Sequence, residues 1–246
     1  MDEHARSVRG MFTSIARHYD LLNHLLSLNL DRRWRRTAAR MAFEDRRPNA
    51  AFLSLNGRKR LRVLDLCSGT GDLALELGRR CSGAGIVALD FVAPMLERGR
   101  GKFRRAGMAD RIHPLCGDAV RLPFRRQSFD VLTMAFGLRN ISPVEEALAE
   151  AARVLRPGGR LVILEFAMPA RGIWRRIYGF YFFRVLPKIG RWISGTSAYS
   201  YLPASVALFL EPERLCELLG QDGFVEAQWQ PLAGGAVAVH TARAPQ

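Results

Sequence analysis

The chain has 246 residues, of which 48% are hydrophobic, and it carries a formal net charge of +14. That length allows one sizeable globular core, and no stretch approaches the roughly 20 apolar residues of a membrane-spanning helix. The charge comes almost entirely from arginine, since lysine occurs only at positions 59, 102 and 188. Such a basic chain is attracted to polyanions, either nucleic acid or an anionic membrane surface.

The N-terminus and the cysteines exclude further classes. Residues 1–10, MDEHARSVRG, are polar and lack the apolar region of a signal peptide. Cys67, Cys81, Cys116 and Cys216 are far apart, with no C-x-x-C pair and no closely spaced histidine. We therefore expect reduced thiols and no metal site, in a cytoplasmic protein that is soluble or at most peripheral to a membrane.

The chain begins with a predicted helical arm at 11–42, in one or two pieces, which carries the basic cluster DRRWRR at 31–36. A polar stretch, EDRRPNAAFLSLNGRKR, separates this arm from the first clear strand. Strands and helices then alternate. The predicted strands are 61–66, 86–90, 111–116, 128–136 and 160–166, and the predicted helices are 72–80, 94–107 and 144–155.

This alternation predicts right-handed βαβ units and an α/β fold, a doubly wound, Rossmann-like sheet. The sequence RPGG at 156–159 marks the end of the helix before the last of these strands. A final helix at 212–223 precedes two closing strands, FVEAQWQ and GGAVAVHTA, which we expect to pair antiparallel. We interpret 1–246 as a single domain, with an arm and substrate lid (11–42), a cofactor-binding core (61–166) and a substrate cap with closing strands (170–246).

A glycine-rich turn, VLDLCSGTGDLAL at 63–75, joins the first strand to the next helix. As Gly69-x-Gly71-x-x-Ala74, with Asp90 downstream, it is acceptable as a dinucleotide fingerprint. However, Asp65 ends the first strand, and a carboxylate there gains nothing from a pyrophosphate but attracts a cation. S-adenosylmethionine (SAM), with its amino group and sulfonium, is therefore the better ligand. A tight turn with no ligand is the remaining reading.

The combination of Asp65-x-x-x-Gly69-x-Gly71, Asp90, Gly117-Asp118-Ala119 and RVLRPGG resembles the class I SAM-dependent methyltransferases over about 61–166. The resemblance implies that Gly69, Thr70 and Gly71 line the methionine end of SAM. It implies further that Asp90 binds the ribose hydroxyls and that Asp118 and Ala119 contact the adenine. This class often has glycine at the position of Cys67, where a small thiol should fit.

The flanking segments are more specific and together resemble the ubiquinone/menaquinone biosynthesis C-methyltransferases from about 11 to 242. The sequence departs from that family at Ala135, where serine can occur, and in ISGTSAYSYLP, which is one residue shorter. The segments that carry the resemblance are MFTSIARHYDLLNHLLSLNLDRRWRR, LDFVAPML, FGLRN, LEF, YGFYFFRVLPKIG and SAYSYLPAS.

The family resemblance implies methylation of a ring carbon of a polyprenyl quinol, and we favour demethylmenaquinol over the ubiquinone precursor. An ionised ring hydroxyl pushes electron density onto the ortho carbon, which attacks the methyl group. Arg139 suits the phenolate-like oxygen, because its guanidinium stays charged. We expect Asn140 to orient the second ring oxygen, and Tyr19, His18 or a water that they hold to accept the ring proton. A solvated loop at 136–140 and a solvated arm are the plainer readings.

The segment 172–193 interleaves seven aromatic residues with five basic ones. It could stack on nucleic-acid bases, lie at an anionic lipid interface, or form a cap helix over the substrate pocket. We expect peripheral contact with the inner face of the cell membrane here or at DRRWRR, and no nucleic acid; a homodimer stays open. The alternatives to a quinol methyltransferase are another SAM methyltransferase, an NAD-dependent oxidoreductase and a basic nucleic-acid-binding module.

Overall fold

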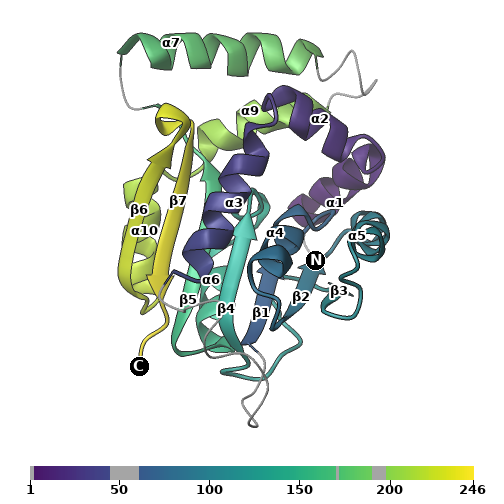
Figure 1. Cartoon of the computed structure of the whole chain (residues 1–246). Helices are drawn as coiled ribbons and strands as arrows, with labels where there is room; N and C mark the ends of the chain where they lie inside the picture. Colours follow the sequence, from purple (N-terminus) through teal and green to yellow (C-terminus); the bar gives the residue numbers. More distant parts are fainter. Residues whose placement is uncertain (1–2, 45–60, 170–171, 190–197) are drawn as a thin grey trace.

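The structure is a computed structural model that describes residues 3–44, 61–169, 172–189 and 198–246 (Figure 1). The predicted polar linker from 45 onward and the start of the shortened segment, 193–197, lie outside the described residues. Within the described ranges one seven-stranded sheet is formed. Its strands are β1 (Leu61–Leu66), β2 (Ala84–Asp90), β3 (Ile112–Cys116), β4 (Phe129–Ala135), β5 (Leu155–Phe166), β6 (Val225–Leu232) and β7 (Val237–Arg243).

Helices precede the sheet, connect its strands and cover it. They are α1 (Glu3–Ile15), α2 (Tyr19–Leu26), α3 (Leu30–Ala42), α4 (Asp72–Arg80), α5 (Ala93–Arg105), α6 (Val144–Val154), α7 (Gly172–Phe180), α9 (Ala198–Leu208) and α10 (Pro212–Gln221). Short turns η1 (Leu138–Asn140) and η3 (Ala233–Gly235) are 3-10, and η2 (Tyr181–Val185) is π-helical.

The N-terminal arm is more divided than the sequence predicted. It begins at Glu3, and its helical content falls into α1, α2 and α3 rather than one or two pieces. The break between α2 and α3 occurs at Leu28 and Asn29, whose φ angles of 53° and 60° are left-handed and end a helix. The arm can therefore bend over the sheet and present side chains from three directions.

The strand order is β3-β2-β1-β4-β5-β7-β6, with β1 to β5 parallel and β7 antiparallel to both neighbours. The predicted doubly wound α/β sheet and the antiparallel closing pair are both confirmed. Because β1 has β2 on one side and β4 on the other, the chain order reverses between β1 and β4. In open α/β sheets a ligand crevice forms at the carboxyl ends of the strands at such a point.

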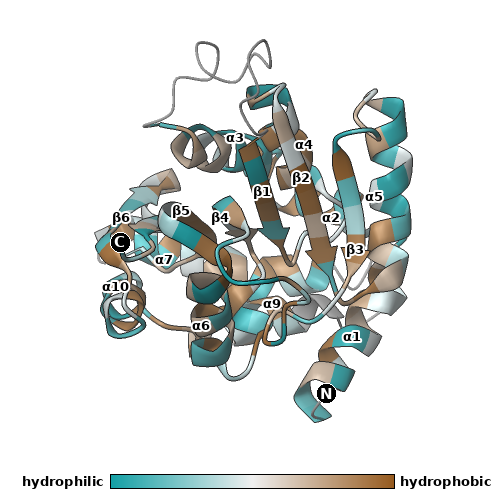
Figure 2. Cartoon of the chain, turned by 90° about the horizontal axis from the view of Figure 1, so that it is seen from below, coloured by the Kyte–Doolittle hydropathy of each residue, from teal (hydrophilic) through white to brown (hydrophobic). Residues whose placement is uncertain are grey.

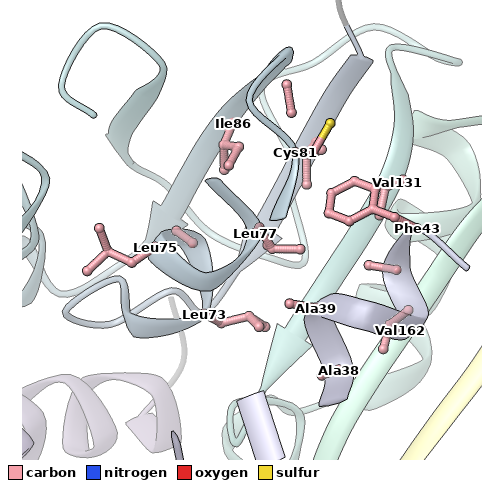
Figure 3. Close-up of a cluster of buried hydrophobic side chains, with 14 of the residues drawn as sticks. Ala38, Ala39, Phe43, Leu73, Leu75, Leu77, Cys81, Ile86, Val131 and Val162 are labelled. Carbon is pink, nitrogen blue, oxygen red and sulfur yellow. The ribbon is translucent and has the colours of Figure 1, made fainter. Parts of the chain in front are cut away.

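Two apolar layers hold this sheet. Seen from below (Figure 2), α3 and α4 lie on one side of it and α6 and α10 on the other. On the first side Ala39 of α3 and Leu77 of α4 gather with Val131 of β4 in the cluster drawn in Figure 3. On the second side Leu148 of α6 and Leu215 of α10 are fully buried. The core thus fixes the strand ends that carry the site.

Gly71, at the start of α4, generates a stability prediction. Its φ is +79°, and an added Cβ would lie 2.3 Å from Cζ of the buried Phe103 ring. Gly71→Ala should therefore destabilise the fold by roughly 2–4 kcal/mol, from backbone strain plus overpacking. Gly85→Ala in β2 is the control, because nothing lies within 4 Å of its Cβ position. Equal denaturant midpoints for the two variants would contradict this prediction.

Candidate functional site

The turns that follow β1 and β4 hold two residues in left-handed backbone conformation. Cys67 has a φ of 50° and Phe136 a φ of 59°. Such strain costs about 1–3 kcal/mol for each residue and is concentrated at functional sites. The turns also touch: a Cβ added to Gly137 would lie 2.3 Å from Cβ of Cys67. Glycine at 137 is what allows the two strained turns to pack side by side.

Three hollows meet around Tyr19 at this edge of the sheet. The loop cavity has a volume of about 340 Å³ and runs from Gly69 and Asp90 to Asp118 and Ala119. The apolar cavity, of about 100 Å³, lies between the arm and residues of 178–186 and 201–202. It is lined mainly by aromatic and aliphatic side chains, among them Phe12, Ile15, Leu26, Trp34, Phe136, Phe166, Tyr178, Tyr181, Phe182 and Leu202.

The polar chamber is the smallest hollow, at about 20 Å³, and lies against the glycine turn. Its wall includes Asp65, Ser68, Thr70 and Arg35. Tyr19 lines all three hollows, and Phe12 and Phe136 line both the loop cavity and the apolar cavity. A ligand in the loop cavity and a second one in the apolar cavity would therefore meet at these three rings.

Asp90 ties the glycine turn to β2. Its Oδ2 accepts a hydrogen bond from the Gly69 N–H, and its Oδ1 accepts one from the Val92 N–H, both at 2.8 Å. Burial raises the pKa of Asp90 to about 6, although these backbone donors oppose the rise. Each carboxylate oxygen keeps a second lone pair, so Asp90 can also accept hydrogen bonds from a bound ligand.

Asp65 is an acceptor without a full set of donors. Its Oδ1 accepts the Thr133 hydroxyl at 2.7 Å. Its Oδ2 and the nearby Ser68 Oγ are buried and have no hydrogen-bond partner among the described residues. Burial raises the pKa of Asp65 to about 7. A cationic donor in the chamber would satisfy the free oxygen and restore the charged form.

Arg139 is held by a buried ion pair. Its Nη1 donates to Glu165 Oε2 at 2.9 Å and to the Phe136 carbonyl at 2.6 Å, and its Nε donates to Ser205 Oγ at 3.3 Å. The guanidinium carbon lies 5.3 Å from the centre of the Phe166 ring. The Glu165 side chain is 0% exposed, so a full negative charge is buried against this arginine. Arg139 thus keeps a fixed position in the wall of the apolar cavity.

Asn140 faces a different hollow from its neighbour Arg139. It lines the loop cavity, and its buried Oδ1 has no partner among the described residues. Its amide nitrogen reaches the Phe136 carbonyl at 3.4 Å. The short helix η1 thus directs these two adjacent polar residues into two different cavities. The sequence did not indicate this separation.

Two of the residues singled out from the sequence lie outside the hollows. Gly71 lines none of the three and instead packs against Phe103. His18 is exposed and also lines none of them. Every other predicted site residue lines at least one hollow. These residues are Asp65, Gly69 and Thr70 in the chamber, Asp90, Asp118, Ala119 and Asn140 in the loop cavity, Arg139 in the apolar cavity, and Tyr19 in all three.

An ionic network that the sequence did not reveal fastens the arm to the core. Lys102 of α5 donates to Asp20 of α2 at 3.0 Å, to the Thr70 hydroxyl at 3.1 Å, and to Asp72 at the start of α4. Burial opposes ionisation of Asp20, but Lys102 and Thr70 more than offset it and lower its pKa. The arm helix α2, which begins at Tyr19, and the glycine turn are therefore held together by Lys102 and by the hydrogen bond that the Thr70 hydroxyl donates to Asp20.

Comparison with known proteins places this geometry in a family. The profile described as the ubiE/COQ5 methyltransferase family matches residues 1–244. The chain is 47% identical over 220 residues to a demethylmenaquinone methyltransferase of Deinococcus radiodurans, covering 89% of this chain and 85% of that protein. A demethylmenaquinone methyltransferase of Thermus thermophilus is 45% identical, with 96% and 100% covered. A ubiquinone/menaquinone biosynthesis C-methyltransferase UbiE of Citrifermentans bemidjiense is 41% identical, with 98% and 97% covered.

Solved structures show the same fold at low identity. A SAM-dependent methyltransferase of Thermotoga maritima, described as a possible histamine N-methyltransferase, has a TM-score of 0.60 at 20% identity, over 96% of this chain and 99% of that one. The [4+2]-cyclase SpnF has a TM-score of 0.59 at 22% identity, over 85% and 81%. At such identities the likeness concerns the fold alone, and the cyclase illustrates that this fold supports other chemistry.

The Lys102 network generates a prediction about the arm. Lys102→Met should destabilise the protein by about 1–3 kcal/mol, because Asp20 and Asp72 lose a charged partner, and amide exchange in α2 should become faster. The difference from wild type should shrink in acid, since a carboxylate with a lowered pKa loses its stabilising charge as it is protonated. Arg104→Met, at an exposed position on the same helix, is the control. Unchanged exchange in α2 would contradict the role of Lys102.

Proposed function

The chain belongs to the ubiE/COQ5 methyltransferase family, and from that premise we propose that the ring it methylates is that of a demethylmenaquinol. Family and relatives make it a SAM-dependent C-methyltransferase of quinone biosynthesis. Support for the naphthoquinol ring comes from the relatives at 47% and 45% identity, both named demethylmenaquinone methyltransferase. The ubiquinone precursor is the alternative acceptor, because the relative at 41% carries the combined name.

The observation that carries the proposal is the wall shared by the loop cavity and the apolar cavity. Three aromatic side chains, those of Phe12, Tyr19 and Phe136, line both hollows and form this wall. The apolar cavity suits a flat aromatic ring with a prenyl tail, because its lining is aromatic and aliphatic. Its two arginines lie beside Phe136, which lines both cavities: Arg139 donates to the Phe136 carbonyl, and the guanidinium carbon of Arg35 lies 5.4 Å from the Phe136 ring. A polar ring edge bound there would face the methyl donor.

The residues of the loop cavity and the polar chamber fit SAM. The cofactor supplies a methyl group on a positively charged sulfur and is cationic overall. Asp65, Asp90 and Asp118 surround the space available to it, and the unpaired Asp65 Oδ2 calls for a cationic donor. In our proposal Asp90 binds the ribose hydroxyls, Asp118 and Ala119 contact the adenine, and Gly69 and Thr70 line the methionine end.

Arg139 stabilises the phenolate-like oxygen of the acceptor in this proposal. Glu165 and Ser205 fix two of its nitrogens, which leaves Nη2 without a described protein partner, and the residue lines the apolar cavity. A preorganised cation that needs no reorientation stabilises developing charge effectively. The ortho carbon then takes the methyl group in line, and the ring loses one proton to become aromatic again.

Tyr19 and Asn140 orient the reactants. Burial raises the pKa of Tyr19, so its neutral hydroxyl is favoured and it suits a hydrogen-bond donor better than a base. We assign the ring proton to a water that Tyr19 holds, since His18 is exposed and outside the hollows. Asn140 lines the loop cavity, as Phe136 does, so in this scheme its free Oδ1 accepts a hydrogen bond where the methyl donor meets the quinol.

We also propose that the cap contacts an anionic bilayer. Ile173, Ile177 and Phe180, spaced along α7, are 70%, 55% and 66% exposed, and Arg176 and Arg184 are exposed beside them. Leu21 and Leu25 of α2 form a second apolar stripe, 60% and 46% exposed.

The location of α7 and α2 beside the apolar cavity supports this surface as the entry for a lipid-soluble acceptor. The Tyr181 hydroxyl donates to the Leu26 carbonyl at 2.7 Å, so η2 and the end of α2 are neighbours, and both residues line the apolar cavity. Figure 1 shows α7 running along the top of the molecule, above α9 and α2. No helix within the described ranges is long and apolar enough to cross a membrane. Contact with lipid would therefore be peripheral, at the inner face of the cell membrane.

The acceptor can be tested directly. Purified protein with SAM should add one methyl group to a short-chain demethylmenaquinol and much less to the matching benzoquinol, as measured by mass spectrometry. A strain that lacks the gene should accumulate quinone without that methyl group. Faster turnover of the benzoquinol would replace the proposed acceptor with the ubiquinone precursor.

Arg139 provides the mutational test. Arg139→Lys keeps a charge for Glu165 but loses the guanidinium fork, and kcat should fall about 100-fold with cofactor affinity unchanged. Arg79→Lys, on the exposed side of α4, should leave both quantities unchanged. Near-normal turnover in Arg139→Lys, with normal affinity for S-adenosylhomocysteine, would remove Arg139 from the mechanism.

The membrane contact is tested by vesicle flotation. Wild type should float with vesicles that contain anionic lipid and less with neutral ones, and Ile173→Glu combined with Ile177→Glu should abolish flotation. Val225→Glu is the control, because Val225 is 47% exposed and pairs with Arg243 at the opposite edge of the sheet from the cap. Flotation of the double variant equal to wild type would count against this surface.

A further inference from the structure

The polar chamber contains charged groups of both signs that the reaction described above does not use together. Arg35 of α3, Asp65 at the end of β1 and Asp72 at the start of α4 all line it, and Arg35 also lines the apolar cavity. The chamber shares Tyr19, Cys67 and Gly69 with the loop cavity. If the adenosine part of SAM lies between Asp118 and Asp90, its amino-acid part must extend past Gly69 toward this chamber.

Arg35 is a buried cation with hydrogen-bond donors that no described residue accepts. It is 7% exposed, its Nη1 donates to Asp31, and its guanidinium carbon lies 5.4 Å from the centre of the Phe136 ring. Its Nε and Nη2 donate to no described residue. Burial lowers the pKa of Arg35, but the nearby Asp72 and Asp31 more than offset this and raise it, so the group stays charged. A buried guanidinium with free donors calls for an anionic ligand.

Two other groups of the chamber favour a cationic ligand. Asp65 Oδ2 and Ser68 Oγ are buried acceptors without partners among the described residues, and both line the chamber. Neither of them lines the apolar cavity. A chamber lined by a cation and by free acceptors is complementary to a zwitterion, which a quinol ring is not. The amino-acid end of SAM carries one carboxylate and one ammonium.

We propose that Arg35 binds the carboxylate of the amino-acid end of SAM while Asp65 accepts its ammonium group. This inference rests on the proposed cofactor site and extends it to a residue of the N-terminal arm. The arm then completes the donor site as well as covering the acceptor. Cofactor binding would thereby hold α3 in place before the acceptor enters, and Asp31 fixes the orientation of the guanidinium.

Isothermal calorimetry with two ligands tests the assignment. S-adenosylhomocysteine carries the amino-acid end, whereas methylthioadenosine lacks it. Arg35→Gln should lower the affinity for S-adenosylhomocysteine about 10- to 100-fold, the range for a lost charge-assisted contact. The affinity for methylthioadenosine should stay within about 2-fold of that of wild type. Arg36→Gln, at the adjacent position with a side chain 64% exposed, should change neither affinity.

Each other outcome overturns a distinct claim. Equal weakening of both ligands would show that Arg35 only supports the fold, and unchanged affinity for both would show that it contacts neither. Retained affinity with lost turnover would move Arg35 to the acceptor. If Arg35→Gln does not fold, Arg35→Lys should still weaken S-adenosylhomocysteine selectively, because it lacks the fork; equal affinity for wild type and this variant would reject the proposal. Wild type that binds neither ligand would instead reject the cofactor site.

Discussion

The site depends on one topological constraint, the reversal of strand order between β1 and β4. These strands run parallel and are paired, with Asp65 beside Thr133. From β1 the chain continues outward to β2 and β3 on one side, and from β4 it continues to β5 on the other. No crossover helix covers their carboxyl ends, so the turns after them must be closed by something else. The N-terminal arm supplies that closure. Three hollows exist at this edge because helices from both ends of the chain arch over a gap that the core cannot fill.

Charge is distributed in a way that the overall composition conceals. A net charge of +14 suggests a uniformly basic surface, but the two arginines at the site, Arg35 and Arg139, are buried and each is matched by a carboxylate. Isolated burial of such groups would cost several kcal/mol, and pairing makes it tolerable. The neutralised pairs can still respond to a ligand, because a guanidinium bound on one edge keeps donors on another.

Periodicity predicted most of the elements, since buried faces impose it: α4 was predicted at 72–80 and lies at Asp72–Arg80. The arm was less predictable, because its breaks depend on left-handed residues and not on apolar spacing. β5 begins at Leu155, earlier than predicted, because Leu155 already pairs with Phe129 of β4 before the RPGG segment. The composition of the glycine turn predicted a ligand site. The role of Arg35 could not be predicted in the same way, because a run of arginines indicates a solvated face. The available signal for a buried arginine was Asp31, four residues earlier on the same helix as Trp34.

The contact between Cys67 and Gly137 has a consequence for how this chain can change over time. Position 67 carries a side chain where a glycine is common in the fold class, and the missing side chain at 137 makes room for it. Substitutions at the two positions are therefore not independent: a larger residue becomes acceptable at 137 only after 67 has lost its own. One order of mutation passes through a viable protein and the reverse order does not.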